Sequence, residues 1–160
     1  MPDLRSAPLP PLAADDHVRG DAGAPLVVMY GDYTCPHCAT AHARLAADDD
    51  VRVAFRHFAL KARHPRAPLL AAAAEAAALQ GEFWAFHDEL FADPGHLDDP
   101  HLWARAERLG LDLARFDADR RSDAVTARVR RDVTGALRAG VAASPTLFLE
   151  GEPHLCWPPA

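Results

Sequence analysis

The feature that most constrains the fold is a short apolar run followed at once by two closely spaced cysteines. Leu26-Val27-Val28-Met29-Tyr30 is wholly apolar and ends at Gly31, and Cys35-Pro36-His37-Cys38 comes shortly after it. A run of this length is typical of a strand buried on both faces of a parallel sheet. Proline suits the first position of a helix, where its missing N–H has no partner to lose. We therefore expect a helix to begin at Pro36, with Cys35 as its N-cap.

The residues after this motif complete a strand–helix–strand unit. Ala39–Ala47 continues the helix, and Val51–Phe58 begins with the alternation of apolar and polar residues that a strand requires. A right-handed crossover is expected between the two parallel strands. Near the C-terminus, Thr146–Leu149 and Glu152–Cys156 predict two further strands, joined by a hairpin turn at Glu150-Gly151. With a two-residue turn, Leu149 would pair with Glu152, and the ladder would continue to Pro145 opposite Cys156.

Between these two parts, the chain from Pro65 to Arg138 reads as helical. Glycine and proline punctuate it at Gly81, Pro94-Gly95 and Gly110. We expect helices at roughly 67–80, 82–92, 99–109, 112–119 and 122–138. The sequence therefore predicts an α/β fold in which a helical domain is inserted between a βαβ unit and a C-terminal β-hairpin.

The expected domain organisation follows from this order of elements. Residues 25–63 and 139–160 would form the α/β domain and residues 64–138 the inserted helical domain. Residues 1–24 show no periodicity and are interpreted as an N-terminal leader that lies across the body or frays.

Composition excludes several classes of protein. Of 160 residues, 49% are hydrophobic and 25% charged, which is ordinary for a globular domain, and the net charge of −6 argues against nucleic-acid binding. No stretch approaches the ~18 apolar residues of a membrane span. The N-terminus has no apolar core of the kind that signal peptides carry. We expect a cytoplasmic protein, or an exported one if this chain is a trimmed form.

A Cys-x-x-Cys pair has two ready explanations, a structural zinc site or a redox dithiol. Tetrahedral zinc needs four ligands. His42 is the only nearby addition to the pair, and Cys156 is the only other thiol, so we expect no metal. A sulfur at a helix N-terminus faces unpaired N–H groups and the positive end of the helix dipole, and both favour the thiolate form of Cys35.

The other residues of the motif fit the redox interpretation. His37 can add a donor or a positive charge near the Cys35 sulfur. Cys38, one helical turn later, is expected to be more buried and poised to attack a mixed disulfide on Cys35. Such chemistry needs no cofactor, because the two sulfurs carry both electrons.

Together with Ser144-Pro145-Thr146 before the last strands, these features resemble the thioredoxin superfamily, in particular its DsbA-like branch. The resemblance covers nearly all of residues 17–155, and the matching stretches are 31–38, 55–60, 80–84 and 140–146. It implies a thioredoxin-like fold with an inserted helical domain, and an enzyme that exchanges disulfides through Cys35 and Cys38. It also implies protein or low-molecular-weight thiols and disulfides as substrates, and a redox partner protein or glutathione.

The resemblance assigns further roles and exposes one departure. Pro145 matches a family proline that is cis and faces the dithiol, and Ser144 would offer its backbone to an extended substrate. Pro36 is included among the expected substrate contacts. Many relatives carry a glutamate six residues before the first motif cysteine, where this chain has Met29. Asp32 is then the nearest carboxylate, so we expect a less efficient proton relay or one supplied by water.

Two alternatives to an oxidoreductase stay open, and neither assigns a role to Cys156. The dithiol could serve a non-enzymatic redox-sensing or binding module that reports to a fused or docked partner, an interpretation favoured by the lack of the family's closing helix. A glutathione-dependent transferase of the related helical-insertion type usually lacks the second cysteine, so Cys38 argues against it. Cys156 is expected to be a buried or half-buried thiol that fills space at the sheet edge.

Overall fold

The computed structural model describes residues 4–159. The chain divides into two compact units, one made of the segments up to Phe58 and from Asp132 onward, the other of Ala59–Arg131. The second boundary between the units falls within the residues of α6 (Asp123–Arg138). The three-part domain organisation expected from the sequence stays a prediction, because compactness alone does not show that a segment folds independently.

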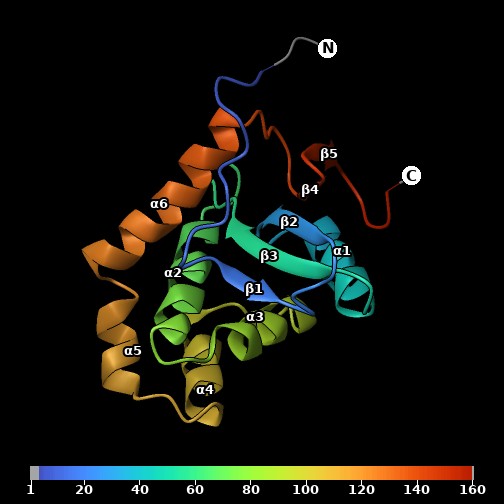
Figure 1. Ribbon diagram of the computed structural model, residues 1–160. Helices are drawn as coiled ribbons and strands as arrows, with labels where there is room; N and C mark the ends of the chain where they lie inside the picture. Colours follow the sequence, from blue (N-terminus) through green and yellow to red (C-terminus); the bar gives the residue numbers. More distant parts are fainter. Residues whose placement is uncertain (1–3, 160) are drawn as a thin grey trace. The chain divides into compact units, whose positions relative to one another are not determined.

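The first unit contains one sheet of five strands in the order β1-β3-β2-β4-β5 (Figure 1). The parallel pair is β2 with β3, and the other neighbours are antiparallel. The strands are β1 (His17–Arg19), β2 (Leu26–Gly31), β3 (Arg52–His57), β4 (Thr146–Leu149) and β5 (Glu152–His154). The thioredoxin-like α/β fold expected from the sequence is confirmed.

The central strand β2 positions everything that follows it. Met29 lies opposite Phe55 of β3 on one side and Leu147 of β4 on the other, and it is 1% exposed. Residues 27–31 are all buried, so both faces of β2 are covered, which explains why this run is apolar without alternation. The helix α1 (Pro36–Ala46) connects β2 to β3, as predicted, and its buried residues are Cys38, Ala41 and Leu45.

The strand β1 was not predicted. It consists of only three residues and pairs with β3, with His17 opposite Phe55 and Arg19 opposite Val53. Three residues are too few to show an alternating pattern, so no local signal separated them from the leader. At least this part of residues 1–24 is therefore integrated in the sheet rather than frayed.

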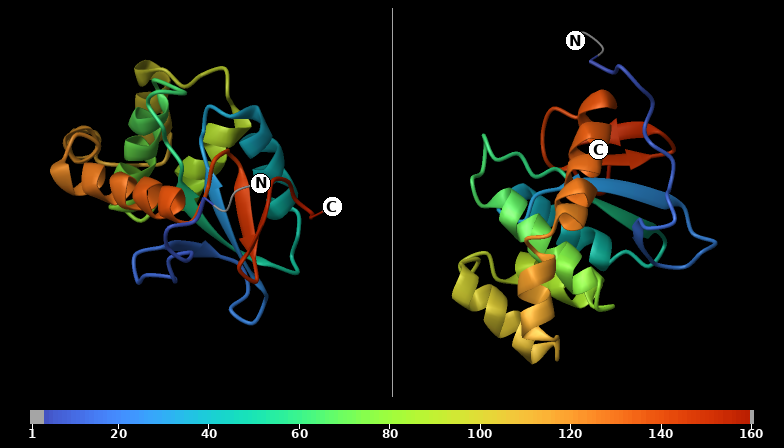
Figure 2. Two further views of the ribbon diagram at one scale, coloured as in Figure 1. Left: turned by 90° about the horizontal axis from the view of Figure 1, so that it is seen from above. Right: turned by 90° about the vertical axis from the view of Figure 1, so that its left-hand side faces the viewer.

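A buried guanidinium fixes the segment before β1. Arg56 of β3 is 3% exposed, and its Nη2 lies 2.7 Å from Oδ2 of Asp16. Its nitrogens also donate to the carbonyls of Pro10 and Pro11 and to the hydroxyl of Tyr30. Closer to the N-terminus, the segment passes the end of α6 (Figure 2), where the amides of residues 6 and 7 donate to the carbonyl of residue 138. Removing one partner of such a buried ion pair leaves an unpaired buried charge and strongly destabilises the fold.

The C-terminal hairpin has the predicted turn and register. Glu150 and Gly151 both have positive φ, at 52° and 83°, as a two-residue hairpin turn of the primed type requires. Leu149 pairs with Glu152, and the ladder ends where Leu147 pairs with His154. The predicted strand over residues 152–156 is therefore two residues too long.

The early end of β5 changes the environment of Cys156. Cys156 is exposed and its thiol donates to the carbonyl of Pro158 at 3.5 Å. The expectation of a buried or half-buried thiol was wrong, because the expected ladder stops before it reaches Cys156.

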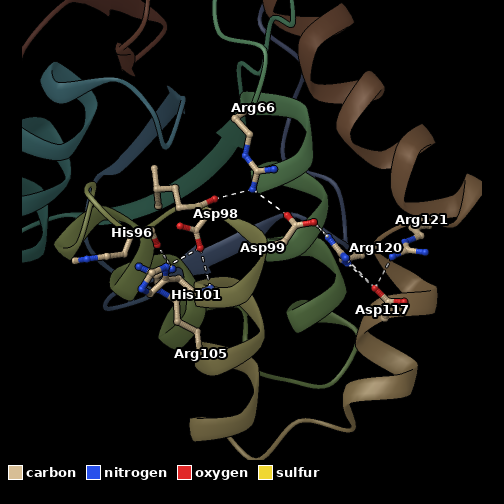
Figure 3. Close-up of polar contacts among 10 residues, drawn as sticks. Arg66, His96, Asp98, Asp99, His101, Arg105, Asp117, Arg120 and Arg121 are labelled. Carbon is tan, nitrogen blue, oxygen red and sulfur yellow. Dashed lines mark hydrogen bonds and ion pairs between the residues drawn. The ribbon is translucent and has the colours of Figure 1, made fainter.

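The second unit is helical, and its helix ends match the sequence prediction to within two residues. The aspartates Asp98 and Asp112 cap α4 and α5 by accepting from the amides of His101 and Arg115. Figure 3 shows Asp98 with His101, and Arg66 donating to Asp99 at 3.0 Å. The helices are α2 (Ala67–Ala78), α3 (Phe83–Ala92), α4 (Asp99–Arg108), α5 (Leu113–Asp119) and most of α6. None of the helices in the described part of the chain is long and apolar enough to cross a bilayer.

Candidate active site

Cys35 occupies the N-cap of α1, as the sequence predicted. Its φ and ψ are −90° and 117°, in the extended region, and Pro36 occupies the first helical turn. Its amide donates to the carbonyl of Asp32 at 3.1 Å, and its carbonyl accepts from the amide of Ala39 at 3.2 Å. The side chain of Cys35 makes no capping hydrogen bond, and Cys35 as a whole is 8% exposed. Its sulfur therefore stands at the helix start, where unpaired amides and the helix dipole favour an anion.

Cys38 is the sheltered member of the pair. It is 0% exposed, and the amide of Asp32 donates to its sulfur at 3.4 Å. Burial raises the pKa of the Cys38 thiol, and the hydrogen bond from the Asp32 backbone lowers it in part. The charge of Cys35 and a hydrogen bond with that residue add to the increase in the pKa of Cys38. Cys38 is thus held as a thiol directly behind Cys35.

The segment before β4 brings Ser144 and Pro145 to the dithiol. The sulfur of Cys35 lies 3.5 Å from the carbonyl oxygen of Ser144, although the two residues are far apart in sequence. The Ser144–Pro145 peptide bond is cis, and Pro145 is buried. Thr146 supports this segment, because its hydroxyl donates to the carbonyl of Ala143 at 2.7 Å. The pairing of β4 with β2 explains how this loop comes to lie beside the start of α1.

Asp32 organises the turn that leads into the motif. Oδ1 of its carboxylate accepts from both the amide and the hydroxyl of Thr34, each at 2.8 Å. Its carbonyl and amide contact Cys35 and Cys38, as described above, and Asp32 is 3% exposed. The sequence singled out Asp32 only as the nearest carboxylate. The structure places one residue in contact with three members of the motif region.

The remaining predicted residues, Pro36 and His37, lie on the solvent-exposed side of the site, which we call its open side. Pro36 and His37 are both exposed, and His37 lines a pocket beside the dithiol together with Ser144 and Pro145. Among the described residues, the ligand atoms of Cys35, Cys38 and His42 do not gather into a group of metal-binding size.

Sequence reasoning missed the far wall of this pocket. Arg44 lies on α1, and its Nη1 donates to the carbonyl of Trp157 at 3.0 Å. The indole of Trp157 in turn donates to the carboxylate of Asp48 at 3.0 Å. A single tryptophan near the C-terminus gives no local sequence signal that it forms a pocket wall. The folded structure shows this role, because Trp157 is only 5% exposed.

A thioredoxin-type sheet with a dithiol at the N-terminus of its first crossover helix defines a class, and comparison with known proteins gives the family. The family model described as Thioredoxin matches residues 13–155. The chain therefore belongs to the thioredoxin family.

Solved structures support the same assignment. The thioredoxin-like oxidoreductase from Silicibacter pomeroyi DSS-3 is 27% identical, with a TM-score of 0.78 over 88% of this chain and 83% of that one. Wolbachia pipientis alpha-DsbA1 is 22% identical, with a TM-score of 0.72 over 87% of this chain and 76% of that one, and shows the shared fold.

The curated relatives that resemble this chain in sequence are named as ion antiporters. The Na(+)/H(+) antiporter NhaA 1 of Salinispora arenicola is 45% identical over 147 residues, which are 87% of this chain and 22% of the antiporter. The chain spans 22–25% of the length of the curated relatives it matches.

Proposed function

We propose that this chain is a DsbA-like protein-disulfide oxidoreductase whose reactive group is the Cys35–Cys38 dithiol. One observation carries the proposal. The sulfur of Cys35 stands at the N-terminus of α1, 3.5 Å from the Ser144 carbonyl, and a second thiol is buried directly behind it. A sulfur at a helix N-terminus and a second, sheltered thiol within reach are what a two-step exchange requires.

The exchange itself balances without a cofactor. The Cys35 thiolate attacks one sulfur of a substrate disulfide, forming a mixed disulfide and releasing a substrate thiolate that takes up a proton. Cys38 then loses its proton and attacks the Cys35 sulfur, which forms the Cys35–Cys38 disulfide and releases the second substrate thiol. The substrate gains two electrons and two protons from the dithiol, and the reverse sequence oxidises a substrate dithiol.

The neighbouring residues have supporting roles. Ser144, Pro145 and Pro36 contact the backbone of an extended substrate, and a proline at the start of a strand leaves no donor to compete there. A protein thiol partner or glutathione returns the dithiol to its starting state.

Turnover and potential test the proposal. The wild-type chain should reduce insulin in the presence of a thiol reductant, or refold scrambled ribonuclease in a glutathione buffer, well above the uncatalysed rate. Equilibration in a glutathione buffer gives the reduction potential, and a value near that of thioredoxin would identify a reductant rather than an oxidant. Rates at background in both assays would contradict an enzymatic role.

His37 has a tuning role in this proposal. A donor or positive charge beside the Cys35 thiolate stabilises the reduced state and makes the couple more oxidising. His37→Ser should therefore lower the reduction potential, by about 10–20 mV if the interaction is worth ~0.5–1 kcal/mol. An unchanged potential would leave the helix N-terminus as the only source of thiolate stabilisation.

A second candidate function is a redox-sensing module that reports to a larger protein. It is supported by the relatives named Na(+)/H(+) antiporter, in which a segment similar to this chain makes up only 22–25% of the length. A sensor would form the Cys35–Cys38 disulfide reversibly in a glutathione buffer yet turn over insulin no faster than background.

A further inference from the structure

A pocket of about 390 Å³ opens beside the dithiol, a volume within the range of small-molecule sites. Its walls come from three segments of the first unit: the exposed side of α1, the loop before β4 and the tail after β5. The lining residues are His37, Thr40, Ala41, Arg44, Ala143, Ser144, Pro145, Leu155, Cys156 and Trp157.

The charge of this pocket differs from that of the protein. The chain has a net charge of −6, yet none of the described residues that line the pocket carries a carboxylate. Arg44 brings a full positive charge, and His37 brings an imidazole. A concave site lined by one sign of charge attracts ligands of the other sign, so the pocket suits an anion.

Arg44 is held in place before any ligand arrives. One nitrogen of its guanidinium donates to the Trp157 carbonyl at 3.0 Å, and Trp157 is anchored by Asp48. A guanidinium has five N–H donors, so this single contact leaves donors for a carboxylate, which it can bind through two parallel hydrogen bonds. The anchored tail therefore both forms a wall and orients the cation.

The spacing along α1 relates this cation to the reacting sulfur. His37 and Arg44 lie seven residues apart, which is close to two helical turns and places them on the same side of the helix about 10 Å apart. The Cys35 sulfur does not itself line the pocket, but it lies 3.5 Å from the carbonyl of Ser144, which does. A ligand sulfur at Cys35 would thus have Arg44 within reach of a carboxylate several bonds away.

We propose that this pocket recognises a low-molecular-weight disulfide that carries carboxylates, of the size of glutathione disulfide, with Arg44 binding a carboxylate. The inference rests on the proposed function and names its substrate class. Cys35 attacks one sulfur of the bound disulfide and releases one carboxylated thiol. Cys38 then displaces the second thiol from Cys35, so the small disulfide gains two electrons and two protons and the protein is left with its Cys35–Cys38 disulfide.

The test compares two small disulfides that differ in charge. For Arg44→Gln, the KM for glutathione disulfide should rise about tenfold, as expected when a hydrogen bond to a charged group is lost. The KM for the neutral bis(2-hydroxyethyl) disulfide should change less than about twofold, which is within the effect expected for a surface substitution. Arg44→Lys should restore part of the affinity, because it keeps the charge but not the planar fork.

Matched variants separate recognition from damage to the pocket wall. Asp48→Ala removes the acceptor of the Trp157 indole and loosens the wall that orients Arg44, but it keeps the Arg44 charge, so it should raise the KM for glutathione disulfide less than Arg44→Gln does. Arg130→Gln removes an exposed arginine that does not line the pocket and should leave both KM values unchanged. Insulin reduction by Arg130→Gln should also match that of the wild-type chain.

The outcomes distinguish this inference from the proposed function. An equal rise in KM for both small disulfides, or no rise for glutathione disulfide, would overturn the role of Arg44. If the wild-type chain reduced no disulfide at all, the proposed function would fail. Binding of the unreactive S-methylglutathione would then still test the pocket, because its affinity should fall about tenfold in Arg44→Gln.

Discussion

The dithiol lies between two unlike regions of the same unit. On one side, Asp32 and Cys38 are 3% and 0% exposed and belong to the interior below the motif. On the other side, His37 and Arg44 are exposed and line a pocket beside Ser144. A single helix start therefore serves two needs of the proposed exchange. Cys35, which would attack, lies next to the pocket residue Ser144, and Cys38, which would resolve the mixed disulfide, is sheltered by burial that raises its pKa.

Exchanging each cysteine for serine tests this comparison with the largest expected effect. Cys35→Ser should reduce activity to the uncatalysed rate, because the buried Cys38 cannot reach a substrate disulfide. Cys38→Ser should instead accumulate mixed disulfides on Cys35, since nothing resolves them. Mass spectrometry after reaction with glutathione disulfide gives the adduct on each variant. Faster alkylation of Cys38 than of Cys35 in the wild-type chain would reverse the assignment.

Removing the Asp32 carboxylate should weaken the buried side. Asp32→Ala loses two hydrogen bonds to Thr34 and should cost about 1–3 kcal/mol of the free energy of unfolding, measured in urea. Thr34→Val removes only the hydroxyl contact and should cost ~0.5–1.5 kcal/mol. Asp32→Asn keeps an acceptor oxygen and should fall closer to wild type. Equal stability of all three variants would show that the turn does not depend on this carboxylate.

The raised pKa of Cys38 predicts a pH dependence of stability in the reduced protein. Above the usual thiol pKa of ~8.5 the unfolded chain releases this proton while the folded chain retains it, so stability should fall as pH rises, by at most ~1.4 kcal/mol per pH unit. The effect of Cys38 can be measured up to about pH 10. Above this pH the buried Tyr30, whose pKa is also raised, lowers stability with rising pH in the same way. Urea unfolding with a reductant should give a shallower slope for Cys38→Ala than for wild type or Cys156→Ser.

The smallest effect is expected at Cys156, on the open side. It is exposed and its thiol already contacts the Pro158 carbonyl, so Cys156→Ser should change insulin reduction less than about twofold. Non-reducing peptide mapping of the mildly oxidised protein should find a Cys35–Cys38 link. A Cys35–Cys156 link would give the open side a third exchanging thiol and remove the contrast between the two regions.

Much of the fold and the centre of the site could be predicted because their signals are local. The apolar run of β2, the proline after Cys35 and the Glu150-Gly151 turn each constrain the backbone over a few residues. Those constraints correctly gave the central strand, the helix start and the hairpin register. The positions of Ser144 and Pro145 at the dithiol came from resemblance, since no local rule joins segments so far apart.

The residues of β2 and α1, the hairpin turn and the position of Cys35 at a helix N-cap all follow from the amino-acid sequence. How the chain around them is held depends on the folded molecule: Arg56 anchors the N-terminal segment, and Arg44 donates to Trp157 in the pocket wall. The physical reason is the range of the interactions. Capping and turn preferences act between neighbours in sequence, whereas a buried guanidinium or a pocket wall depends on partners that only the folded sheet brings together.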